Sequence, residues 1–95
     1  MHRRSLAHVA LRVRLSGGSE DVFSEQRWVE KRLALTGEDL ERIPKATRFY
    51  FNIEHGDLLM VVKVTVHLES GRWLPDDSEL VGCYRSEAWA SVRKD

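Results

Sequence analysis

The sequence predicts an α+β fold, in which helices cover one face of a three-stranded sheet that contains an antiparallel pair. Two observations support this prediction. In some stretches apolar and polar residues alternate, as in half-buried strands, and in others apolar residues recur every three or four positions, as in amphipathic helices. The 95 residues are enough for one domain, over residues 1–95, with a modest core. The predicted order of elements is β-α-α-β-β-α.

The composition is that of a soluble globular protein, with 42% apolar and 32% charged residues. The fifteen Lys and Arg balance the fifteen Asp and Glu, so the strong basic charge typical of nucleic-acid-binding proteins is missing. The only cysteine, Cys83, excludes an internal disulfide and a zinc site made of several cysteines. No apolar run is long enough to cross a bilayer, so we expect a cytoplasmic protein without a membrane partner.

The first strand is predicted from Val9 to Leu15, where every second residue is apolar. The segment before it is rich in arginine and has no acid, as in a mitochondrial presequence. The alternation favours a strand over the amphipathic helix of a presequence, so we expect only a short, loose basic tail at residues 1–4. The sequence Ser16-Gly17-Gly18-Ser19 predicts a turn after the strand.

Two helices are predicted next. The first begins after Ser19, a favourable N-cap residue, and places Val22, Val29 and Leu33 on one helical face. The second is a short helical turn over residues 37–43, which ends before a proline.

The clearest pattern in the chain predicts an antiparallel hairpin. Apolar residues alternate with polar ones from Phe49 to Ile53 and recur at every second position from Met60 to Leu68, on either side of the turn sequence His55-Gly56-Asp57. We expect the helices to cover one face of the resulting sheet. The predicted buried residues are Val9, Leu11, Val13, Leu15, Phe49, Phe51, Ile53, Met60, Val62, Val64, Val66 and Leu68.

A third helix is predicted near the end of the sequence. Pro75 is followed by acidic residues, as at a helix start, and apolar residues recur every four positions from Leu80 to Val92. Gly82 argues against this helix, because glycine destabilises a helix interior. The alternative is a short strand over residues 81–84 followed by a shorter helix.

The three tryptophans fall outside the predicted core pattern and indicate an interface. Tryptophan is enriched where protein interfaces carry their binding energy, and the edges of a small sheet also invite pairing. We therefore expect a homodimer or a complex with another protein. Packing of the tryptophans within the chain is the alternative. The predicted interface residues are Trp28, Leu35, Trp73 and Trp89.

The polar face of the predicted sheet is a second candidate site. Cations beside an aromatic residue suit a small anionic ligand or a single-stranded nucleic acid, although nucleic acid is not the favoured partner. A solvated sheet face has the same composition. The residues concerned are Arg12, Arg14, Arg48, Tyr50, Lys63 and His67.

A small enzyme is the third hypothesis. His8 and His67 could face each other across paired strands, with Glu69 nearby, and such a group could bind a metal or transfer protons. The histidines lack metal-ligand spacing within any one element, so we expect no metal site and no cofactor. The favoured prediction is therefore a non-catalytic protein that acts by binding.

Overall fold

The computed structural model describes residues 9–35, 37 and 40–95, and every regular element in these residues is a β-strand. The strands are β1 Ala10–Leu15, β2 Glu20–Ser24, β3 Gln26–Leu33, β4 Leu40–Glu54, β5 Leu58–Glu69, β6 Arg72–Tyr84 and β7 Trp89–Lys94. Strands β2, β1 and β7 form an antiparallel small sheet in that order, and β3, β4, β5 and β6 form an antiparallel large sheet in sequence order.

The predicted α+β class is wrong, because strands replace all of the predicted helices that the described residues cover. The first predicted helix is occupied by β2 and β3, and the last by the end of β6 and by β7. The apolar residues at helical spacing, Val22, Val29 and Leu33, are all exposed. Of the second predicted helix, residues 38–39 lie outside the described residues, and β4 begins at Leu40. Cross-strand pairing over long hairpins has overridden the local helical pattern.

The predicted hairpin is confirmed as β4 and β5, and the first predicted strand as β1. His55 and Gly56 both have positive φ, at 52° and 85°, as in a type I′ turn, although three residues, 55–57, separate the paired Glu54 and Leu58. Ser70 and Gly71, at 55° and 77°, make the same kind of turn between β5 and β6. These two turns set the register of three long strands in the large sheet.

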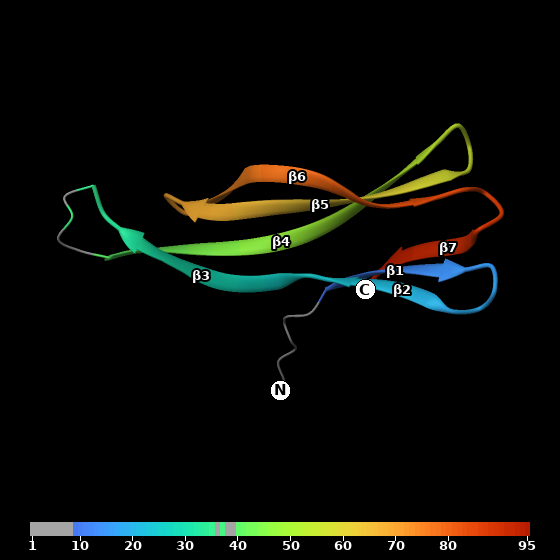
Figure 1. Cartoon of the computed structure of the whole chain (residues 1–95), viewed down its shortest axis with the longest axis horizontal. Helices are drawn as coiled ribbons and strands as arrows, with labels where there is room; N and C mark the ends of the chain where they lie inside the picture. The colour runs from blue at the N-terminus through green and yellow to red at the C-terminus, as the bar shows by residue number, and fades with distance from the viewer. Residues whose placement is uncertain (1–8, 36, 38–39) are drawn as a thin grey trace.

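The chain passes between the two sheets at two points (Figure 1). Only Glu25 separates β2 from β3, and residues 85–88 separate β6 from β7. The small sheet lies at one end of the large sheet, and the other end extends past it, in a molecule of 55 × 36 × 19 Å (Figure 1). We call the extended part the arm. It consists of residues 26–33, 40–47, 64–69 and 72–79.

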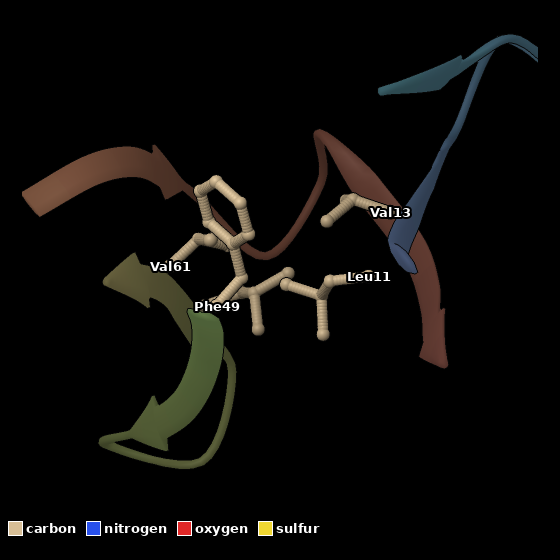
Figure 2. Close-up of a cluster of buried hydrophobic side chains, with 5 residues drawn as sticks. Leu11, Val13, Phe49 and Val61 are labelled. Atoms are coloured by element: carbon tan, nitrogen blue, oxygen red, sulfur yellow. The ribbon is translucent and has the colours of Figure 1, made fainter. Parts of the chain in front are cut away.

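The core lies between the two sheets, at the end away from the arm (Figure 2). Its buried members come from β1, β4 and β5, and the rings of Phe23 and Phe49 lie 5.5 Å apart. Partly buried side chains from both sheets surround them, among them Trp89 and Tyr84. The buried core residues are Leu11, Val13, Phe49, Leu59 and Val61.

The predicted core is right for Leu11, Val13, Phe49 and Val66, which are buried, but Phe51 and Ile53 are each 42% exposed, and the predicted phase in β5 does not give the residues that face the small sheet. Leu59 and Val61 are fully buried, whereas the predicted stripe from Met60 to Leu68 lies on the opposite face, because successive residues of a strand alternate between faces. The start of β5 is apolar at consecutive positions, so alternation did not determine which set faces the core. We call the face with Phe49, Leu59 and Val61 the core face of the large sheet, and the other the open face.

Candidate interaction surface

The open face carries apolar side chains on all four strands of the large sheet. Residues directly opposite each other in antiparallel strands share a face, so the register assigns them. Tyr50, Val62 and Leu80 form one row across β4, β5 and β6. The small sheet packs on the core face, and no described strand lies across the open face, although Nζ of Lys94 at the end of β7 lies 4.5 Å from the centre of the Tyr50 ring. Its apolar residues are Val29, Leu33, Leu40, Pro44, Ala46, Tyr50, Leu58, Met60, Val62, Val64, Val66, Leu68, Trp73, Pro75 and Leu80.

Several of these side chains are well exposed. The exposed fraction of Leu33 is 65% and that of Leu80 is 56%, at opposite sides of the sheet. Leu33 lies directly opposite Leu40, which is also exposed. Large contiguous apolar patches are rare on the surface of a monomeric protein and usually mark a binding site.

A cation–π contact crosses the middle of the open face. The guanidinium of Arg48 lies 5.6 Å from the centre of the Trp73 ring. Arg48 is opposite Val64 and Trp73 is opposite Leu68, so the pair spans β5 above Val66. This position explains why Val66 is only 6% exposed although it lies outside the core between the sheets.

The charges on the open face are mostly positive. The register places Arg27, Lys31, Arg42 and Arg48 on this face, all on β3 and β4. Glu54 is the only acidic residue that the register assigns to it among the described residues. None of the four cations forms an ion pair within the described part of the chain. The face therefore combines an apolar floor with cations available to a partner.

The core face of the arm carries a cluster of ion pairs instead. Lys45 Nζ lies 3.1 Å from a Glu30 oxygen and 3.2 Å from an Asp76 oxygen. His67 contacts Asp76 through Nδ1 at 2.6 Å and Glu69 through Nε2 at 3.1 Å. Hydrogen bonding to Glu69, and to Asp76, raises the pKa of His67 above its ordinary value. The hydrogen bond with Glu30, and that with Asp76, raises the pKa of Lys45.

Asp76 owes its place in this cluster to a β-bulge. The register shifts between Thr65 and Val66, where Asp77 and Pro75 are their partners, so Asp76 is the inserted residue. A bulge redirects a side chain, and here it accompanies contacts of the carboxylate with Lys45 and His67. Burial raises the pKa of Asp76, but the hydrogen bonds from the two cations outweigh it and lower the pKa. The sequence pattern instead predicts that Asp76 lies in the acidic first turn of a helix, and the structure shows that this prediction is wrong.

A hollow of about 460 Å³ lies beside this cluster. Both ring nitrogens of His67 are engaged with carboxylates, so its proton is held within the cluster. Among the described residues no group of three or more His, Cys, Asp or Glu is arranged to hold a metal ion. The hollow is therefore lined by charged side chains, but its described residues do not form a recognisable catalytic or metal-binding arrangement. Its lining residues are Arg32, Glu41, Arg42, Ile43, His67, Leu68 and Glu69.

The residues predicted for a polar sheet face lie on three different surfaces. The outer face of the small sheet is held by ion pairs, such as the one at 2.6 Å between Arg12 and Asp95. His8 lies outside the described residues, as does the predicted tail at 1–4, so the pairing of His8 with His67 stays a hypothesis. The small sheet carries Arg12 and Arg14, the core face of the large sheet carries Lys63 and His67, and the open face carries Arg48 and Tyr50.

The residues predicted for an interface are also spread over the molecule. Trp28 lies opposite Lys45 on the core face of the arm and is exposed, and Leu35 is exposed in the loop after β3. Trp73 lies on the open face under Arg48. Trp89 packs against the core, and its Nε1–H donates a hydrogen bond of 2.8 Å to the carbonyl oxygen of Asp57. The aliphatic residues of the open face are not identifiable as surface residues from the sequence, because their alternation is also typical of a buried face.

Comparisons with protein-family models, curated proteins and solved structures found no match for this chain. In the part of the chain that the structure describes, no helix is long and apolar enough to span a membrane. The surface itself is therefore the basis for assigning a function.

Proposed function

We propose that this protein is a non-catalytic cytoplasmic binding protein that docks another protein on the open face of its large sheet. The observation that carries this proposal is the set of apolar rows across four strands, which no described element covers. A binding role also fits the His67 cluster, in which the charged groups are paired with each other.

The charges of the open face favour a partner that combines apolar side chains with carboxylates. Such a partner covers the apolar rows and neutralises Arg27, Lys31, Arg42 and Arg48. A second copy docked face to face would bring together the same cations, with only Glu54 from each copy to balance them. Burying unpaired charges of one sign is costly, so a different, acidic protein fits this face better.

The test uses peptides of defined chemistry. A synthetic peptide in which valine and glutamate alternate should bind and change the fluorescence of Trp73, whereas a peptide in which valine and lysine alternate should not. Arg42→Glu should weaken binding of the acidic peptide at least about fivefold, because it reverses one complementary charge. Arg14→Glu is the matched control, since Arg14 is an exposed arginine on the small sheet, and it should change the affinity less than about twofold.

Two results would contradict the proposal. One is the absence of binding by either peptide at low salt, and the other is an equal effect of Arg14→Glu and Arg42→Glu. A single-stranded oligothymidine serves as a third probe. The face is assigned to nucleic acid instead if the protein does not bind the acidic peptide but binds this oligonucleotide with an affinity that falls as the salt concentration rises.

A further inference from the structure

We infer that two copies of this chain pair edge to edge through residues 48–54 of β4 and join their large sheets into one. This inference goes beyond the proposed function, because it uses an edge of the large sheet and not its open face.

The edge arises because β3 is shorter than β4. β3 pairs with β4 only from Leu40 to Thr47, whereas β5 pairs with β4 as far as Glu54. The chain before β3 turns away at Glu25 into the small sheet. From Arg48 to Ile53, β4 therefore has a neighbouring strand on one side only, and its outward backbone groups have no backbone partner among the described residues.

The residues of this edge lack the features that usually protect a sheet edge from pairing. A flanking charge comes from Lys94 of β7, whose Nζ lies 4.5 Å from the centre of the Tyr50 ring and 3.7 Å from a Glu25 oxygen. Residues 49–53 include no charged residue, proline or glycine, and they are mainly aromatic and β-branched, which favours strand pairing. Tyr50 is 46% exposed and Phe51 42%. The β6 edge, in contrast, has Pro75 and two bulges, and the β3 edge carries several charged residues.

The segment is complementary to itself in an antiparallel arrangement. With Phe51 on a two-fold axis, Arg48 lies opposite Glu54 of the second copy at both ends of the pairing. Phe49 then lies opposite Ile53 of the second copy. Residues directly opposite in an antiparallel pair lie about 4.5–5.5 Å apart and share a face. Arg48 and Glu54 are both on the open face, so the guanidinium of Arg48 meets Glu54 of the second copy on that side when it leaves its contact with Trp73.

The start of β3 limits the register of this pairing. In the arrangement centred on Phe51, Glu54 of the second copy lies opposite Arg48, and His55 of the second copy would fall opposite Thr47, where Gln26 is already paired. The strand of the second copy therefore ends where β3 begins. A two-fold axis perpendicular to the sheet also keeps both open faces on the same side, so the dimer presents one continuous apolar surface.

A dimer that depends on Arg48 and Glu54 is tested by measuring the mass in solution of the wild type and of variants in which these two charges are reversed or exchanged. Sedimentation equilibrium of the wild type should show twice the chain mass at high concentration. Arg48→Glu and Glu54→Arg should each weaken dimerisation about tenfold, because each places like charges opposite one another twice per dimer. The double variant R48E/E54R should restore the affinity to within about threefold of the wild type, since it re-forms both pairs.

Folding of each variant is checked by its circular dichroism spectrum. Phe51→Lys is a further variant that places two ammonium groups at the axis and should abolish dimerisation. Lys31→Glu is the matched control, because it changes an exposed charge on the β3 edge and should leave the mass unchanged. The inference is overturned by a monomer at every concentration, or by a dimer that neither single variant weakens or that the double variant fails to restore. These outcomes do not depend on peptide binding, which tests the open face separately.

Discussion

The hydroxyl of Tyr84 donates a hydrogen bond of 2.7 Å to Oδ2 of Asp21, and this bond joins the two sheets. Tyr84 ends β6 in the large sheet, and Asp21 is the partner of Val13 in the small sheet. The bond lies at the margin of the core, where both side chains are part-buried. Burial, together with the bond to Asp21, raises the pKa of Tyr84 to about 12.

Replacing Tyr84 with Phe should lower stability. Tyr84→Phe removes the donor and leaves a part-buried carboxylate without this partner, which should cost about 1 kcal/mol. Urea denaturation of the two proteins measures this difference. Tyr50→Phe is the control, because Tyr50 is an exposed tyrosine for which no hydroxyl hydrogen bond is described, and its unfolding midpoint should match that of the wild type.

The raised pKa of Tyr84 also predicts a loss of stability at high pH. The contribution of this hydroxyl is fully present below the ordinary pKa of 10 and is lost as pH rises through the folded-state value of about 12. The melting temperature of the wild type should therefore fall more steeply than that of Tyr84→Phe between pH 10 and 12. Parallel curves for the two proteins would show that Asp21 does not hold the proton on Tyr84.

The His67 cluster predicts a second pH dependence, closer to neutrality. The pKa of His67 is raised by its contacts with Glu69 and Asp76, with Lys45 also facing Asp76. The stabilisation is complete below the ordinary value of 6.5 and is lost as pH rises through the higher folded-state pKa. Denaturation midpoints of the wild type should decline over this range, and those of His67→Gln should not. The same decline in His67→Gln would assign the effect to another group.

The phase of β5 is tested by two aspartate substitutions. Val61→Asp places a carboxylate in the core and should cost several kcal/mol of the roughly 5–15 kcal/mol that stabilise a small domain. Val64→Asp places the same group on the open face, where solvent reaches it, and should be much milder. The melting temperatures of both variants show which of the two residues faces the core. A larger loss for Val64→Asp would mean that the open face is covered.

The parts of the fold that the sequence predicts correctly are those set by local turn chemistry. The turn sequence His55-Gly56-Asp57 is predicted from its glycine, and strict alternation identifies β1 and residues 49–53 of β4. The same local signals misled the helix predictions, because an exposed strand such as β3 needs no regular apolar pattern. Its position is fixed by pairing with β4, which single-sequence periodicity does not report.

The sequence shows the apolar alternation of the open face but does not show that these residues lie on the surface. Every second residue from Met60 to Leu68 is apolar, and the usual explanation for such a stripe is a core. The chain instead uses Leu59 and Val61 for its core and leaves the stripe open. The position of Asp76 in the His67 cluster depends on a bulge, and a bulge changes the phase of a strand without a clear signal in the sequence.

The pairing of β1 with β7 has a consequence for the order of folding. Val13 pairs with Val92, so the small sheet joins segments that are far apart in the chain, whereas the strands of the large sheet pair through successive hairpins. Local hairpins form before distant contacts, because a distant pair must first close a long loop. During synthesis, the large sheet can therefore assemble while Phe49 and Val61 still face water. Among the described strands, β7 leaves the ribosome after the others, and it completes the small sheet and closes the core.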